Sequence, residues 1–257
     1  MSRKSTAPML FRGVAPARPD ARLAERPLGE HSISSQPPSA GPLAARRQLV
    51  GGLGAAVIVG AAAGTPLRAL ASGADGQRIV TPRQSLGPFY PVDWSGDADN
   101  DLVIVRGEAA RALGQVAHVR GRVVDRDGTP LPDAIVEIWQ CDAKGVYRHP
   151  RDRGGRDPGF QGRGSTRTGD DGGWTFRTIR PAPYPGRTPH IHFFVRTPDG
   201  RELVTQLYVA GDPGNAGDFL LNSVRDPRQR ERLIARFDPA DRIEPGALLA
   251  NYEIVLA

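Results

Sequence analysis

The stretch "GRTPHIHFFV", residues 186–195, decides the fold that this sequence predicts. In an extended strand, side chains two positions apart lie on the same face of the sheet. His190 and His192 therefore share one face, Ile191 points to the other, and an aromatic and aliphatic run follows. The chain has only five histidines, and two of them stand here. This pattern predicts a strand whose two histidines share one face, opposite Ile191.

Short strands separated by turns are predicted on both sides of this stretch. They are expected within residues 118–125, 134–142, 169–181, 190–200, 202–212 and 251–257. Glycine and proline, of which the whole chain has 31 and 24, stand between many of them, while residues 72–115 look irregular and are expected to wrap over the main fold. Such spacing is typical of an all-β fold, and we predict an antiparallel β-sandwich with long loops.

One short C-terminal helix is predicted in "DPRQRERLIARF", residues 226–237. Asp226 has the side chain of a good N-cap, because its carboxylate accepts hydrogen bonds from the first free backbone N–H groups. Pro227 then stands at the first helical position, which tolerates a residue without an N–H group.

The N-terminal part has a different character. Residues 1–45 are rich in Pro, Arg, Ala and Ser, and we expect them to be disordered. Arg46 and Arg47 then precede an uncharged run at 49–64, followed by the small residues Ala69 and Ala71. This pattern predicts a twin-arginine (Tat) signal segment and export to the periplasm or outside the cell. The run is short for a membrane span, and an uncleaved signal that anchors the protein is the alternative.

We therefore divide the chain into a leader with its signal segment at 1–71 and one β domain at 72–257. The formal net charge of +6 lies entirely in the leader, which has nine Lys or Arg and three Asp or Glu. Residues 72–257 contain 25 basic and 25 acidic residues, so no nucleic-acid-binding surface is indicated. The single Cys141 excludes an internal disulfide, and we expect it in the core or at its rim.

The residues by themselves leave the chemistry of the histidine pair open. Two imidazoles on one strand face can bind one metal ion, or each can simply be hydrogen-bonded in the core or at the surface. Tyr147 in "GVYRHP" and Tyr184 in "APYPG" stand beside turn formers, from which a side chain can reach a site. Tyrosine is more commonly a packing residue with a satisfied hydroxyl.

Longer motifs, all in the same order, resemble the intradiol ring-cleavage dioxygenases, in particular the protocatechuate 3,4-dioxygenase-like branch. They are "GPFYP" (87–91), "DNDLV" (99–103), "GRVVDRDGTPLPDAIVEIWQCDAKGVYRHP", "DDGGWTFRTIRPAPYPGR", "PHIHF" and "TQLYVAGDP". The resemblance covers most of residues 80–257. It implies a β-sandwich that cleaves a catechol-type diol with O2, giving a cis,cis-muconate-type diacid.

The resemblance also implies a cofactor, non-haem Fe(III), held by Tyr147, Tyr184, His190 and His192. Phenolate is a hard, anionic donor that suits ferric iron, and a nearby cation lets a phenol ionise at neutral pH. By the same resemblance, Tyr184 is the phenolate that leaves the metal and takes a substrate proton. His149, beside Tyr147, is expected near the site or at the surface.

Arg187 and Gln206 complete the catalytic set that the resemblance implies. Arg187 would stabilise the negative charge that develops on the substrate ring, although an arginine here could also simply cap the loop. Gln206 would lie beside the substrate, and the alternative is a strand-edge amide. Gly186 stands where the protocatechuate branch has a tryptophan, which predicts a wider pocket.

Two other functions stay open from the sequence. One is an exported β-sandwich that keeps the ligands but serves as a binding module, and the other is a zinc- or copper-binding β protein. The particular catechol and the oligomeric state, including a homo-oligomer, are not determined by the sequence.

Overall fold

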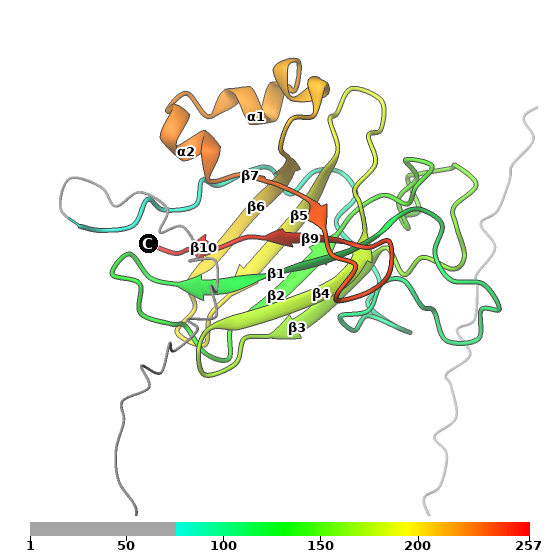
Figure 1. Ribbon diagram of the computed structural model, residues 1–257, viewed down its shortest axis with the longest axis horizontal. Coiled ribbons are helices and arrows are strands. Elements are labelled where there is room, and N and C mark those ends of the chain that lie inside the picture. Colours follow the sequence, from blue (N-terminus) through cyan, green and yellow to red (C-terminus); the bar gives the residue numbers. More distant parts are fainter. Residues whose placement is uncertain (1–75) are drawn as a thin grey trace, which may run out of the picture. The chain divides into compact units, whose positions relative to one another are not determined.

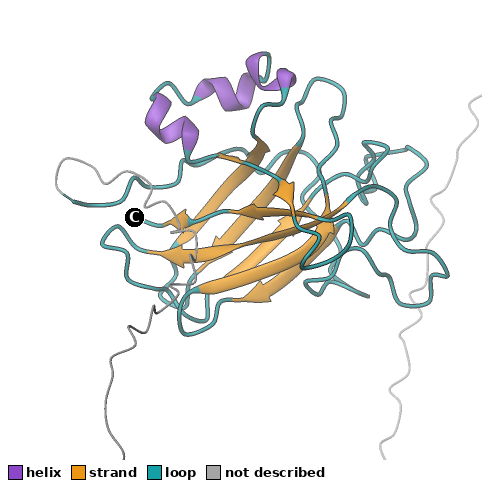
Figure 2. Ribbon diagram, viewed as in Figure 1, coloured by secondary structure: helices purple, strands orange, loops and turns teal. Residues whose placement is uncertain are grey.

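The computed structural model describes residues 76–257 (Figure 1), so the predicted leader and signal segment lie outside the described residues. In this part of the chain strands dominate and the helices are few and short (Figure 2), which confirms the all-β prediction. The strands are β1 (Val116–Val124), β2 (Ile135–Trp139), β3 (Arg163–Arg167), β4 (Gly173–Ile179), β5 (His190–Arg196), β6 (Glu202–Val209), β7 (Ile234–Ala235), β8 (Asp238–Pro239), β9 (Leu248–Asn251) and β10 (Ile254–Val255).

The strands form two five-stranded sheets. In one, β1 is flanked by β4 on one side and by β9 and β10 on the other, and β8 follows β9. In the other, the order is β3-β2-β5-β6-β7. The prediction of a purely antiparallel arrangement is wrong, because β1 pairs in parallel with β9 and β10, and β6 pairs in parallel with β7. The β6–β7 connection passes through helices, and a crossover of that kind returns the chain in the same direction.

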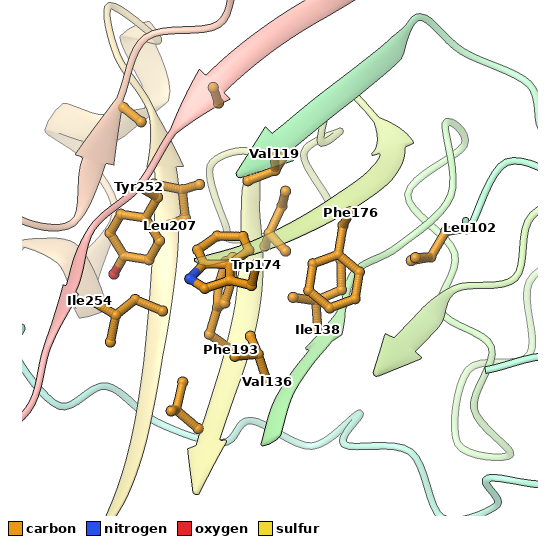
Figure 3. Close-up of a cluster of buried hydrophobic side chains, with 14 of the residues drawn as sticks. Leu102, Val119, Val136, Ile138, Trp174, Phe176, Phe193, Leu207, Tyr252 and Ile254 are labelled. Atoms are coloured by element: carbon orange, nitrogen blue, oxygen red, sulfur yellow. The ribbon is translucent and has the colours of Figure 1, made fainter. Parts of the chain in front are cut away.

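Side chains of both sheets share one buried cluster (Figure 3). As the alternation predicts, Ile191 and Phe193 of β5 point into this cluster, while His190 and His192 contact Tyr147 and Trp139 of a separate cluster. The Trp174 ring of β4 packs against Phe193 with centroids 5.4 Å apart, which joins the two sheets. Burying each such side chain stabilises the fold by roughly 1.5–3 kcal/mol.

A glycine inside β1 marks a close approach of the C-terminal segment to this strand. A Cβ added to Gly121 would lie 1.7 Å from the backbone oxygen of Tyr252, in the short break between β9 and β10. Only glycine allows the backbone of Tyr252 to approach β1 this closely.

Three short helices connect β6 to β7: the 3-10 helix η1 (Pro213–Ala216), α1 (Phe219–Ser223) and α2 (Pro227–Glu231). The predicted start of α2 is confirmed, since the Asp226 side chain accepts from the backbone N–H of Arg228 and Pro227 begins the helix. The predicted extent is wrong: Leu233 turns into the protein beside Tyr208, and β7 begins at once. No helix in residues 76–257 is long and apolar enough to cross a membrane.

The irregular segment before β1 packs against both sheets, as predicted, and the N–H of Thr81 donates to Val255 of β10 at 3.0 Å. Gln84 donates its backbone N–H to Val204 of β6 at 2.9 Å, and the Thr205 hydroxyl donates to the carbonyl of Pro82 at 2.8 Å. This brings Gly87 and Phe89 to the end of the sheet where β5 begins. The edge strand β3 was not predicted, because its sequence "RGSTR" has no apolar alternation.

Candidate active site

The four predicted ligands converge at the start of β5. Tyr147 comes from the loop after β2, Tyr184 from the loop between β4 and β5, and the histidines from β5 itself. The Tyr147 hydroxyl lies 3.4 Å from Nε2 of His190, and the two histidine Nε2 atoms lie 3.2 Å apart. The Tyr184 ring centroid is 5.4 Å from that of Tyr147 and 5.5 Å from that of His190. Tyr184 is half-buried, and the other three are buried.

The surroundings hold both histidines neutral. Nδ1 of His190 lies 2.6 Å from the carbonyl oxygen of Thr188, which places the proton on Nδ1 and leaves a lone pair on Nε2. Burial, followed by the charge of Arg187, lowers the pKa of His190 to about 4. Burial also lowers the pKa of His192 well below its ordinary value, with His190 and Arg187 adding to the effect. Neutral imidazole is the form that binds a metal ion.

The His192 ring is clamped from two sides. Trp139 of β2 stacks on it with centroids 4.7 Å apart and an interplanar angle of 9°. A Cβ added to Gly87 would meet its Cε1 at 3.1 Å. Nδ1 of His192 is buried and has no hydrogen-bond partner among the described residues, so packing fixes the orientation of this ring.

Phe89 covers the two tyrosines. Its ring stacks on Tyr147 with centroids 4.6 Å apart and meets Tyr184 edge-on at 6.0 Å. Burial raises the pKa of Tyr147 well above its ordinary value, and Cys141 and Tyr184 add to the shift. Burial also raises the pKa of Tyr184, although the charge of Arg187 opposes the rise. Both phenols therefore stay protonated at neutral pH unless a cation stabilises the phenolate.

Arg187 is buried beside these groups in a dense set of contacts. Its Nε donates to Asp218 at 2.8 Å, and its Nη2 donates to Gln206 at 2.7 Å and to the Tyr208 hydroxyl at 3.1 Å. Its backbone N–H donates to the backbone carbonyl of Tyr184 at 2.9 Å. Its guanidinium lies 5.6 Å from the ring centroid of the exposed Phe219. The positive charge predicted at this position is therefore next to the candidate ligands.

Gln206, opposite His192 in the β5–β6 register, is fully buried. Its amide oxygen accepts from Arg187 and from Tyr208, and its amide nitrogen donates to the carbonyl of Ser85 at 2.9 Å. Both ends of the amide are thus used by protein groups, and Gln206 holds Arg187 in place.

Gly186 is exposed beside this arrangement. Gly186 has a φ of +81°, and a Cβ added there would meet no atom within 4 Å. His149 lies near the site without joining the four ligands: its ring meets Phe89 at 5.7 Å, and its Nδ1 accepts from the backbone of Arg151. In residues 76–257 no group of three or more His, Cys, Asp or Glu could hold a metal ion, so this donor set reaches four only with its tyrosines.

Several residues of this site were not predicted from the sequence. Trp139 could have been found from strand pairing, because it stands opposite His192 in the β2–β5 register. Phe89 lies within the motif GPFYP, but nothing in the sequence indicated that its ring packs on Tyr147. Asp218 gave no signal at all, since an aspartate before a short helix is an ordinary N-cap.

Comparison with known proteins agrees with this arrangement. The model of a family described as "Dioxygenase" matches residues 86–257. The chain is 36% identical over 184 residues to the protocatechuate 3,4-dioxygenase beta chain of Burkholderia cepacia, covering 68% of this chain and 78% of that protein. It is 33% identical over 190 residues to catechol 1,2-dioxygenase of Acinetobacter baylyi, covering 67% of this chain and 57% of that protein.

Solved structures give the same result. One is the dioxygenase domain of a dioxygenase–carbohydrate-binding fusion from Streptomyces sp. SirexAA-E, with 32% identity and a TM-score of 0.55, covering 69% of this chain and 98% of that one. Catechol 1,2-dioxygenase from an Acinetobacter species has 29% identity and a TM-score of 0.53, covering 69% and 62%. From this family match and these relatives, the chain belongs to the intradiol ring-cleavage dioxygenase family and is an enzyme of that type.

Proposed function

We propose that this enzyme uses O2 to cleave a catechol-type diol between its two hydroxylated carbons, at a non-haem Fe(III) site, giving a cis,cis-muconate-type diacid. The observation that carries the proposal is the convergence of two phenols and two neutral imidazoles at the start of β5.

The residues present fit a ferric ion. The Thr188 carbonyl leaves the Nε2 lone pair of His190 free, on the side where Nε2 of His192 also lies. Two phenols with raised pKa values favour a strongly charged cation, because only such a charge makes both of them anionic donors at neutral pH. We therefore assign Tyr147, Tyr184, His190 and His192 as the ligands.

When bound there, Fe(III) supplies Lewis acidity and a template that make the diol reactive toward O2. The residues divide the remaining work by their burial. Tyr147 is buried under Phe89, and we assign to it the role of the ligand that stays in place. To the half-buried Tyr184 we assign the role of leaving the metal and accepting a proton from a substrate hydroxyl. Arg187 holds a fixed positive charge beside Tyr184 and stabilises negative charge on the substrate ring.

The substrate class is an aromatic 1,2-diol, the chemistry that the names of its relatives share: protocatechuate, catechol and hydroxyquinol. The match spans 57% of the catechol enzyme and 54% of the hydroxyquinol enzyme, so we take from them the shared diol only. We also propose that Gly186, which has no side chain, leaves room for a substituted ring.

Purified protein tests the proposal. Tyrosine phenolate bound to Fe(III) gives a visible charge-transfer band, which we expect to shift when a catechol is added. His192→Ala should lose the iron and the band. Tyr184→Phe should keep the iron and turn over more slowly. His149→Ala is the matched control, because this histidine lies near the site but outside the ligand set, and it should behave like the parent.

A colourless, iron-free protein that still folds would overturn the proposal and favour a binding module. A preparation that holds zinc or copper in place of iron would favour the other alternative.

We also infer a β-sandwich domain over residues 72–257, since side chains of both sheets share one core.

For residues 1–71 we propose export through the Tat route to the periplasm or outside the cell, with an uncleaved, anchoring signal as the alternative. Fractionation of cells that express the full chain, with Arg46 and Arg47 replaced by lysine as the comparison, tests this route. The elution volume of the purified enzyme tests whether it forms a homo-oligomer.

A further inference from the structure

We propose that Asp218 is a positioning residue of this active site, which holds Arg187 and the backbone before His190 in their working arrangement. The proposal rests on the role assigned above to Arg187. It gives a function to a carboxylate that belongs neither to the ligand set nor to the substrate pocket.

The Asp218 carboxylate is saturated by its neighbours and only 1% exposed. Oδ2 accepts from Nε of Arg187 at 2.8 Å and from the backbone N–H of Thr188 at 3.1 Å. Oδ1 accepts from the backbone N–H groups of Leu220 at 3.1 Å and Leu221 at 2.9 Å, which begins helix α1. One side chain thus joins the loop before β5 to the helix after η1.

Two routes lead from this carboxylate to the reacting groups. The first runs through Arg187, whose charge lies beside Tyr184 and whose backbone N–H donates to the backbone carbonyl of Tyr184 at 2.9 Å. The second runs through Thr188: its N–H donates to Asp218, and its carbonyl oxygen lies 2.6 Å from Nδ1 of His190. A displacement of Asp218 would therefore reach a ligand on each route.

The charge of Asp218 matters as well as its shape. Within residues 76–257, Arg187 forms one salt bridge, and its partner is Asp218. The side chains of Arg187 and Asp218 are 6% and 0% exposed. The other hydrogen-bond partners of the guanidinium, Gln206 and Tyr208, are uncharged. A buried cation that loses its only paired anion is strongly disfavoured and tends to move toward water.

The test compares Asp218→Asn with Arg187→Leu and with the double variant, all as iron-loaded full-length enzyme. Asparagine keeps the helix-capping oxygen but removes the charge. We expect Asp218→Asn to lower kcat about 10- to 100-fold, the usual range for a residue that orients a ligand, with a smaller change in KM. The iron content should stay near that of the parent. The double variant should be no slower than Arg187→Leu alone, because residues that act through one another are not additive.

Asp226→Asn is the matched control. Asp226 caps α2 as Asp218 caps α1, since its Oδ1 accepts from the backbone N–H of Arg228 at 2.8 Å, but it is not among the contacts of the site. This variant should turn over like the parent. An equal loss in both aspartate variants would mean that capping, and not positioning, explains the result, and would overturn the proposal.

The remaining outcomes separate this proposal from the one before it. If Arg187→Leu turns over like the parent, the role of Arg187 in the proposed function fails. If Arg187→Leu is slow while Asp218→Asn matches the parent, the positioning role fails alone. Asp218→Ser keeps a capping oxygen in a smaller side chain and is the second variant. Loss of cooperative unfolding in both Asp218 variants would show a purely structural role and would also overturn the inference.

Discussion

A single methyl group at Gly87 should disturb the candidate iron site. Gly87 has a φ of +73°, and an alanine Cβ there would lie 3.1 Å from Cε1 and 3.7 Å from Nε2 of His192. Holding an L-residue in this left-handed region costs about 1–2 kcal/mol. The contact also requires the imidazole to give by a few tenths of an ångström, yet Trp139 is stacked on the same ring. Gly87→Ala should therefore both destabilise the fold and displace a ligand.

Gly96→Ala isolates the backbone cost, because Gly96 has a φ of +76° and no atom within 4 Å of the added Cβ. The backbone conformation costs each variant about 1–2 kcal/mol, and in a domain of this size the Tm falls by about 2–4 °C for each kcal/mol lost. Both variants should therefore lower the Tm by about 2–8 °C. Only Gly87→Ala should also lose iron, visible absorption and turnover. Thermal unfolding, iron analysis and oxygen uptake measure the three effects. If the two variants have equal iron content and equal turnover, a side chain at residue 87 does not displace His192, and the reasoning is refuted.

Three further predictions concern the fold. Phe193→Ala removes a fully buried ring from the shared core and should cost about 3–5 kcal/mol in urea unfolding, whereas Phe194→Ala on the opposite, half-buried face should cost less. Hydrogen bonds from Arg177 lower the pKa of Glu244 from 4.5 to about 2, so the contribution of Glu244 to stability is complete above pH 4.5 and is lost as the pH falls toward 2. The stability of Glu244→Gln should change less over this pH range, and a variant whose stability depends on pH in the same way as the parent's would contradict the assignment. Burial raises the pKa of the Cys141 thiol to about 12, so iodoacetamide at about pH 8 should label it only after unfolding, and rapid labelling of the native enzyme would contradict its burial.

Strand β5 shows how far local sequence patterns reach. The alternation of His190, Ile191, His192 and Phe193 assigned each side chain to a face of the sheet, and the structure confirms both faces. The start of α2 was predictable for a similar reason, since Asp226 and Pro227 act on their own backbone. The end of α2 was not, because the packing of Leu233 beside Tyr208 decides it.

The parallel pairs of β1 with β9 and β10 lie beyond any local pattern. Parallel and antiparallel neighbours need the same side-chain alternation within a strand. Direction is decided by how the connecting chain returns to the sheet, which depends on packing and not on the strand's own residues.

The sequence by itself determined which side chains carry the proposed chemistry, because residue identity and the two-residue period of a strand are local properties, and the ordered motifs around them resemble one enzyme family. The family resemblance implied that the four ligands meet, but only the tertiary structure gave their contacts and those of Arg187: Tyr147 comes within 3.4 Å of His190 across 43 residues, and Arg187 reaches Asp218 across 31. Contacts over such separations form only when strand register, loop path and burial agree, and the energy of burying a charged or polar group then selects the partner that satisfies it.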